Sequence, residues 1–276
     1  MNFEILRIAL AVGGTALAAR QDAKTSYIDD NLLYAMIAAG AVLDLLTFDA
    51  DFIFSSFAIF AVIMFAGYFA FRSGQFGAGD AYLLAGIHLL IPVHPSIIPA
   101  AVPSYFLFFP PVLSAFIAAS FLAVLGSAAG YACLLKRKLR SWKATLLFAL
   151  AAGIAGAAFG AGASILLSVF LTVFLSASLF LLIYKDEIMH GLVVTRVPLS
   201  KVEDEDVLAV DKLPARFVAR WRIGKVATKE VMARLRRSGV ASVWVHKNLP
   251  RFGPYVLFGL LATLLAGDPV AFVLLH

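Results

Sequence analysis

The chain has 276 residues, of which 62% are hydrophobic and only 14% are charged, and its mean hydropathy is +0.91. A water-soluble domain cannot bury this much apolar surface, so the composition excludes an ordinary soluble enzyme and predicts an integral membrane protein. The single cysteine, Cys133, excludes an internal disulfide and a cysteine-rich zinc site.

Eight apolar segments predict an α-helical polytopic membrane protein with about eight transmembrane helices, because most of them approach the length that crosses a bilayer. These segments are residues 5–19, 32–48, 52–71, 81–91, 111–135, the two halves of 144–184, and 252–275. No small-residue cleavage site and polar mature domain follow the first segment, so we expect a retained helix and not a removed signal peptide. Glu4 lies three residues before Arg7 and is a candidate partner for it.

The stretch between the fourth and fifth predicted helices contains six prolines within residues 92–111. Proline removes a backbone donor and breaks regular helices, so a loop or half-helix is expected there. Its aromatic residues suit the outer membrane interface, where aromatic belts form. These residues are Tyr105, Phe106, Phe108 and Phe109.

The basic residues predict the orientation of the helices. With eight crossings, Arg20, Arg72 and the basic cluster at residues 136–140 fall on one side, and Asp49 and Asp268 fall on the other. By the positive-inside rule the basic side is the cytoplasm, and both chain ends lie outside. Asp22 and Asp80 then both sit at the cytoplasmic face.

Residues 185–251 have the character of a soluble domain, because they contain 14 of the 23 Lys and Arg and 8 of the 17 Asp and Glu. Two β-rich runs at 192–197 and 241–245 and a short helix from Thr228 to Arg237, capped by Thr228 and stopped at Gly239, predict a small α+β fold. The expected domains are therefore a membrane-embedded core of about seven helices at 1–184, a basic cytoplasmic domain at 185–251 and a C-terminal helix at 252–276.

The basic cytoplasmic domain is expected to lie against anionic lipid headgroups, at about 1 kcal/mol for each basic residue near the surface. A plain solvated face remains the alternative. Nucleic acid is not an expected partner, because the domain is tethered between two membrane helices.

A glycine-rich hinge at residues 72–82 ends in Asp80 and separates two long apolar runs. Gly74, Gly77 and Gly79 make this backbone easy to bend and easy for another chain to approach. A carboxylate at the edge of a bilayer marks an ion path, a proton relay or a catalytic site. The alternative is that Asp80 only caps the helix that follows it.

Asp22 follows the first predicted helix and is the second carboxylate expected at this face. If the first and fourth helices pack side by side, the Asp22 and Asp80 carboxyl groups can meet, share a proton and titrate as a pair. An aspartic protease hydrolyses peptides with such a pair, without metal or cofactor. The sequence has no His-Glu-x-x-His motif for a zinc protease.

The segment Phe76-Gly77-Ala78-Gly79-Asp80, together with Asp22, Lys24 and Ile28, resembles the prepilin peptidases of the GxGD aspartyl protease class. The similarity is to their archaeal branch, which includes preflagellin peptidases, and it extends to Phe252-Gly253-Pro254 and Gly267-Asp268. The resemblance implies substrates that are prepilin or preflagellin precursors, cut behind a short basic leader at the cytoplasmic face. It also implies that Asp22 and Asp80 are the catalytic pair, and that Gly77 and Gly79 shape the turn that the substrate backbone approaches.

Two departures from the bacterial relatives qualify this resemblance. Many of them have lysine two residues after the GxGD aspartate, where this chain has Tyr82. The bifunctional members carry a cysteine-rich zinc segment between the first two helices and also methylate the new N-terminus, whereas residues 21–31 contain no cysteine. We therefore expect a protease without methylase activity.

Asp29 and Asp30 lie on the same cytoplasmic connection as Asp22. Two interpretations are open: they attract the basic leader of a substrate, or they balance Arg20 and Lys24 and begin the second helix.

Two other functions use the same residues. An intramembrane protease of the presenilin or signal-peptide-peptidase type also has GxGD, and residues 99–103 faintly resemble its proline-alanine-leucine motif, although the topology places them outside. A proton-coupled transporter would use Asp22 and Asp80 as a relay beside a broken helix, although no repeat relates the two halves. A purely structural scaffold is the remaining alternative.

Overall fold

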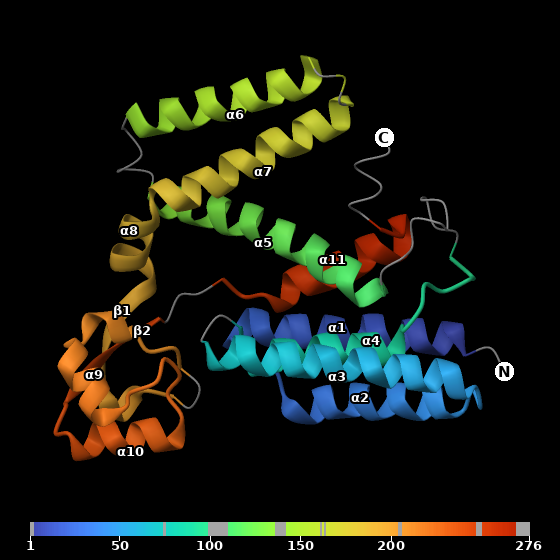
Figure 1. Ribbon diagram of the computed structural model, residues 1–276, viewed down its shortest axis with the longest axis horizontal. Coiled ribbons are helices and arrows are strands. Elements are labelled where there is room, and N and C mark those ends of the chain that lie inside the picture. The colour runs from blue at the N-terminus through green and yellow to red at the C-terminus, as the bar shows by residue number, and fades with distance from the viewer. Residues whose placement is uncertain are drawn as a thin grey trace. The chain divides into compact units, whose positions relative to one another are not determined.

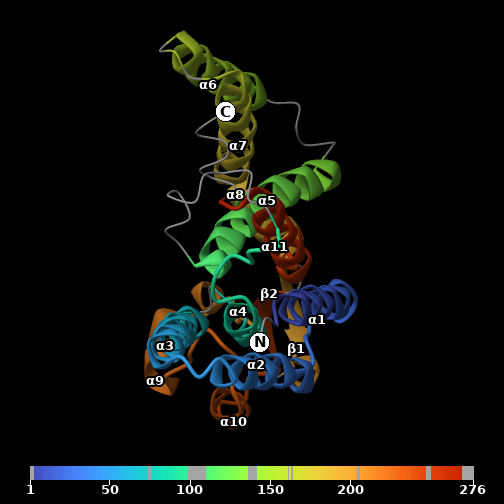
Figure 2. The ribbon, with the colours of Figure 1, turned by 90° about the vertical axis from the view of Figure 1, so that its right-hand side faces the viewer.

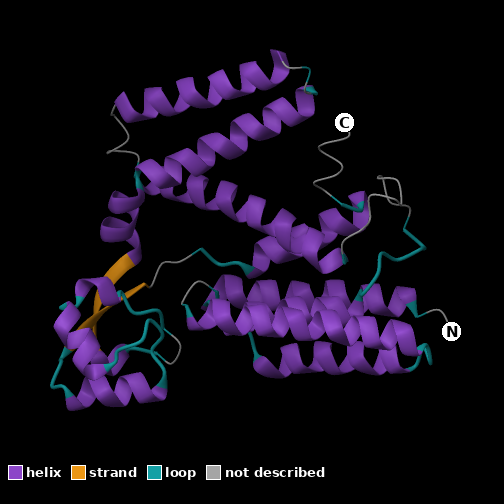
Figure 3. Ribbon diagram, in the orientation of Figure 1, coloured by secondary structure: helices purple, strands orange, loops and turns teal. Residues whose placement is uncertain are grey.

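The computed structural model describes residues 3–73, 76–98, 110–135, 142–160, 162, 164–203, 206–246 and 250–268. The chain forms two compact units. Unit 1 comprises Met1–Gly67, Ala78–Ile183 and Arg251–His276, and unit 2 comprises Tyr68–Gly77 and Tyr184–Pro250. Helices dominate, and one strand pair is present among the described residues (Figures 1 and 3). The aromatic residues at 105–109 and the basic cluster at 136–140 lie outside the described residues.

Helices form at each of the eight apolar segments that the sequence predicts. They are α1 (Glu4–Thr25), α2 (Asp30–Leu45), α3 (Ala50–Arg72), α4 (Ala78–Leu90), α5 (Pro111–Leu134), α6 (Trp142–Gly160), α7 (Ile165–Ile183) and α11 (Gly253–Ala266). Within the described ranges, α3, α5 and α7 are long and apolar enough to cross a membrane, and α4 and α11 are shorter apolar helices. At 1.5 Å per residue the 13 residues of α4 span about 20 Å, less than a hydrocarbon core of about 30 Å. Eight crossings therefore remain a prediction.

Helix α4 is the most buried helix of unit 1. Every residue from Leu83 to Leu90 is buried, and Figure 2 shows α4 between α1, α2 and α3. Glycines bring α2 against it, since a Cβ added at Gly40 would lie 2.6 Å from the Leu89 Cβ, and one at Gly86 would lie 3.1 Å from the Met36 Cβ. Small residues at such contacts let membrane helices pack by close backbone approach.

Helix α11 packs against both α5 and α1. At its crossing with α5, a Cβ added at Gly259 would lie 2.3 Å from the Ala115 carbonyl oxygen. Helices α6 and α7 form a hairpin, and α7 also contacts α5, where the Phe121 ring meets those of Phe170 and Phe174 edge to face at 5.1 and 4.7 Å. Gly259 therefore allows α11 and α5 to approach closely.

Unit 2 is built on an antiparallel strand pair. Its elements are α8 (Lys185–Ile188), a π-helical turn (Met189–Val193), β1 (Val194–Pro198), 3-10 turns (Leu199–Lys201 and Val210–Lys212), α9 (Ala215–Trp221), α10 (Lys229–Arg237) and β2 (Ser242–His246). Val194 pairs with His246, and Pro198 pairs with Ser242. Around this pair lies a core that includes Leu208, Leu235 and Val245.

The predicted local signals of unit 2 are confirmed. The Thr228 side chain accepts a hydrogen bond from the Val231 N–H at 3.3 Å and caps α10. The chain leaves this helix through Gly239, whose φ of +75° favours glycine. Both strands also form within one or two residues of the predicted runs.

Candidate functional site

Asp22 lies inside α1, in its last turn, and not after the helix as the apolar pattern predicts. The helix continues beyond the apolar run and ends only at Ser26, whose φ is +58°. The buried residues of α1 recur at intervals of three or four and form one stripe: Arg7, Ala11, Thr15, Ala18, Ala19 and Asp22. Residues with this spacing lie on the same helix face, so Asp22 is buried because it ends the packing stripe of α1.

The Asp22 carboxylate is held by the beginning of α11. Asp22 is only 8% exposed, and its Oδ2 accepts a hydrogen bond from the Gly253 backbone N–H at 2.8 Å. Arg251 reaches the same end of α1, where its guanidinium donates to the Ala23 carbonyl oxygen and, at 3.2 Å, to Ser26 Oγ. The sequence gives no local signal for this contact, because 231 residues separate Asp22 and Gly253.

Asp80 lies in the first turn of α4 and is half-buried. Its neighbour Gly79 lies close to Ile28 and Leu33, since an added Cβ would be 3.8 Å from a side-chain carbon of each. At the far end of the same helices, Arg7 Nη1 donates to the Leu89 carbonyl oxygen at 3.1 Å. Helices α1 and α4 are therefore antiparallel, and the last turn of α1 and the first turn of α4 lie at the same end of unit 1, here named the Asp22 end.

The two glycines of the motif differ in their structural setting. Gly77 is exposed and precedes α4, whereas Gly79 is its second residue. An alanine methyl group at Gly79 would make only ordinary van der Waals contacts with Ile28 and Leu33. Packing within this chain therefore does not require glycine at position 79.

Asp29 and Asp30 are exposed and begin α2 at the Asp22 end. The Asp29 side chain accepts hydrogen bonds from the Asn31 backbone N–H at 2.9 Å and from Asn31 Nδ2 at 3.1 Å, so it is the N-cap of this helix. Its own backbone N–H donates to Gln21 Oε1 at 2.9 Å. Asp29 thus has the helix-starting role that the sequence offered as one of two readings.

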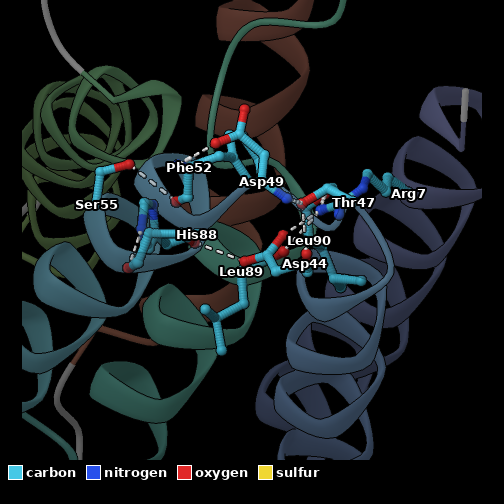
Figure 4. Close-up of polar contacts among 10 residues, drawn as sticks. Arg7, Asp44, Thr47, Asp49, Phe52, Ser55, His88, Leu89 and Leu90 are labelled. Atoms are coloured by element: carbon cyan, nitrogen blue, oxygen red, sulfur yellow. Dashed lines mark hydrogen bonds and ion pairs between the residues drawn. The ribbon is translucent and has the colours of Figure 1, made fainter.

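A buried polar network occupies the opposite end of these helices (Figure 4). Arg7 Nη1 donates to Asp44 Oδ1 at 2.7 Å, and neither side chain is more than 11% exposed. The candidate pairing of Arg7 with Glu4 is wrong, because Glu4 accepts hydrogen bonds from Ser96 Oγ and the Ile97 N–H instead. Arg7 lies on the buried stripe of α1, and its guanidinium is directed to α2 and α4.

The network continues from α2 into α3 and α4. Ser56 Oγ donates to Asp44 Oδ2 at 2.6 Å, and the His88 ring nitrogen Nε2 lies 3.0 Å from the Ser56 carbonyl oxygen. All three residues are almost completely buried. His88 therefore joins α4 to α3 by a hydrogen bond, as expected for a packing histidine, and the network ties four helices together.

These features define a class of protein. Apolar helices long enough to cross a bilayer identify a membrane protein, and two carboxylates lie at one end of its packed helical unit. Within the ranges that the structure describes, no group of three or more His, Cys, Asp or Glu is arranged to hold a metal ion.

Residues 9–128, which are less than half of the chain, match the model of the type IV leader peptidase family. The match begins in α1, ends in α5 and includes both Asp22 and Asp80. The family indicates that the protein is a protease. No curated protein and no solved structure shows significant similarity to the chain.

Proposed function

We propose that the protein is an aspartyl endopeptidase that removes the short basic leader from prepilin-type or preflagellin-type precursors, with Asp22 and Asp80 as its catalytic pair. The observation that supports this most is their placement: two carboxylates, 58 positions apart in the sequence, lie at the same end of one packed unit. Both also fall within the segment that matches the leader peptidase family.

The proposed chemistry needs one ionised and one protonated carboxyl group. The ionised group takes a proton from water while the water oxygen attacks the carbonyl carbon, and the protonated group donates its proton to the carbonyl oxygen. As the tetrahedral intermediate collapses, the carboxylate that gave up its proton takes one from a hydroxyl of the intermediate, the C–N bond breaks and the leaving nitrogen takes the proton of the other carboxyl group. Two nearby carboxylates suit this division, because mutual repulsion disfavours ionisation of both.

The substrate class follows from the family and from the charge of this surface. A basic leader would meet Asp29 and Asp30, which are exposed at the Asp22 end. The positive-inside pattern supports a cytoplasmic location for this end. The hydrophobic helix behind the leader would remain in the bilayer, so that the scissile bond lies at the membrane surface.

The role of Asp29 and Asp30 in leader recognition can be tested without losing the helix cap. Asn is as good an N-cap as Asp, so Asp29→Asn with Asp30→Asn keeps α2 while removing two negative charges. We expect KM for a lysine-rich leader to rise and kcat to stay unchanged. An unchanged KM at low ionic strength would remove both residues from substrate recognition.

Methylase activity is not part of the proposal. In this chain α1 ends at Thr25 and α2 begins at Asp30, and the connection between them contains no cysteine. A zinc-binding segment of the bifunctional type therefore has no counterpart between these helices.

The basic surface of unit 2 is proposed to contact anionic lipid headgroups. Residues 215–237 contain eight Lys or Arg and one acidic residue, Glu230. Seven of these eight basic residues are exposed: Arg216, Arg220, Arg222, Lys225, Lys229, Arg236 and Arg237. Anionic lipid attracts basic clusters of this kind.

The experiment that tests the function is cleavage of a tagged prepilin or preflagellin by the purified protein in liposomes, with mass determination of both products. A single cut at the leader boundary and an unmethylated new N-terminus are expected. Fragments cut within the transmembrane helix would instead indicate a protease of the presenilin type. If no precursor is cut and the liposomes show proton-coupled uptake, the transporter alternative replaces this proposal.

A further inference from the structure

The structure links the last helix to Asp22, although this helix lies outside the part of the chain that matches the peptidase family. Gly253 is the first residue of α11, and its N–H is one of the helix donors that lack a partner within the helix. This N–H donates to Asp22 Oδ2 at 2.8 Å. The positive end of the α11 dipole therefore faces the carboxylate.

The approach of α11 to α1 at Gly253 leaves little room for a side chain. A Cβ added at Gly253 would lie 3.0 Å from Asp22 Oδ2, 3.1 Å from the Asp22 Cβ and 3.4 Å from the Ala19 Cα. The first two separations are tighter than almost all real Cβ contacts, and the second atom is a side-chain carbon next to the backbone. A side chain at position 253 therefore requires α11 or the last turn of α1 to shift by a few tenths of an ångström.

Two further contacts hold the beginning of α11 in place. Arg251 donates to the Ala23 carbonyl oxygen and to Ser26 Oγ, and so binds the carboxyl end of α1 two residues before Gly253. Gly259 lies about 9 Å further along α11 and packs against the Ala115 carbonyl oxygen and the Ala119 nitrogen of α5. Helix α11 is thus fixed at both places, and its first N–H has a defined position.

We infer that Gly253 is a positioning residue of the peptidase site, whose N–H fixes the Asp22 carboxyl group in the orientation needed to act with Asp80. This inference rests on the proposed function. It assigns the C-terminal helix to the site: the family-matched segment supplies both carboxylates, and α11 supplies the donor that orients one of them. Arg251 supports the same contact from the chain that leads into α11.

The test measures kcat and KM for cleavage of a prepilin substrate by wild type and by Gly253→Ala. The alanine keeps the N–H but displaces it from Oδ2, so the substrate should bind as before while the reaction slows. We expect kcat to fall by about threefold to tenfold with KM changed less than about twofold, because the required shift is a few tenths of an ångström and a 1 Å misplacement costs about a hundredfold in rate.

Gly13→Ala is the matched control. Gly13 lies in α1, the helix that Gly253 contacts, and an added Cβ there would meet nothing within 4 Å. It should retain the wild-type kcat and KM. A loss of folded protein would lower the total rate without a change in the reaction at each site. The kcat is therefore calculated per folded protein, which size-exclusion chromatography in detergent quantifies.

The result that overturns the inference is a wild-type kcat for Gly253→Ala while Asp22→Asn is inactive. If Asp22→Asn still cleaves the substrate, the proposed function itself fails. Should Gly253→Ala not accumulate, Arg251→Lys replaces it, since lysine keeps the charge but lacks the planar fork whose Nε and Nη1 reach Ser26 and Ala23. A fall in kcat of at least about threefold at constant KM then supports the inference, and an unchanged kcat overturns it.

Discussion

Gly79 and Gly67 lie on neighbouring helices and differ in what an added methyl group would meet. At Gly79 the nearest atoms are side-chain carbons at 3.8 Å, whereas a Cβ at Gly67 would lie 2.5 Å from the Ala81 Cβ. Gly79→Ala is therefore expected to fold normally but to lose about tenfold in kcat/KM, about 1.4 kcal/mol, because the methyl group obstructs the substrate backbone.

Gly67→Ala is the comparison variant. Its clash between α3 and α4 should destabilise the fold by about 1–3 kcal/mol, as overpacking does. Folded yield and thermal stability in detergent, measured beside cleavage kinetics, separate the two effects. If Gly79→Ala cleaves at the wild-type rate, no substrate backbone passes over this glycine.

The residue-scale predictions succeeded where the chemistry is local. Thr228 was identifiable as a cap because its partner, the Val231 N–H, is three residues away. The partner of Arg7 was not identifiable, because Asp44 is 37 residues away and is chosen by helix packing, while Glu4 is nearer in sequence. The contact of Asp22 with Gly253 was hidden for the same reason.

At the scale of elements, the Arg7–Asp44 pair should contribute strongly to stability, because it lies where α1, α2 and α4 meet. Removing one partner leaves a buried charge without compensation, so Arg7→Met or Asp44→Leu alone should cost about 3–5 kcal/mol. The double variant should cost much less than the sum of the two single variants.

Denaturant unfolding in detergent measures this coupling. The control is the exposed pair of Arg234 and Glu230, whose atoms lie 3.7 Å apart and whose removal should cost less than about 1 kcal/mol. Additive effects of the Arg7 and Asp44 substitutions would show that the network does not hold the helices together.

Apolar run length located the helices well but did not determine their packing. Each predicted segment contains a helix, because long apolar stretches favour this backbone in a membrane. The first apolar segment ends at residue 19, whereas α1 continues to Thr25. Hydropathy detects the bilayer interior and not the last helical turn. The close crossing of α11 and α5 involves two glycines, Gly259 and Gly126, which hydropathy does not distinguish.

At the scale of the whole molecule, the family could be predicted from two short motifs, and the match over residues 9–128 confirms it. The motifs did not reveal that unit 2 includes Tyr68–Gly77 together with Tyr184–Pro250, because segments distant in sequence associate through packing. They also did not reveal how the carboxylates are held. The pairing of Asp22 with Asp80 as a catalytic unit remains the central proposal.

The most direct measurement is the rate of precursor cleavage by wild type, Asp22→Asn and Asp80→Asn at equal amounts of folded protein. Asparagine keeps the size of each side chain but cannot carry the proton, so each single variant should lose about a hundredfold to ten-thousandfold in kcat. Asp211→Asn, at an exposed position of unit 2, is the control and should cleave normally. Near-normal cleavage by either Asp22→Asn or Asp80→Asn would contradict the aspartyl mechanism.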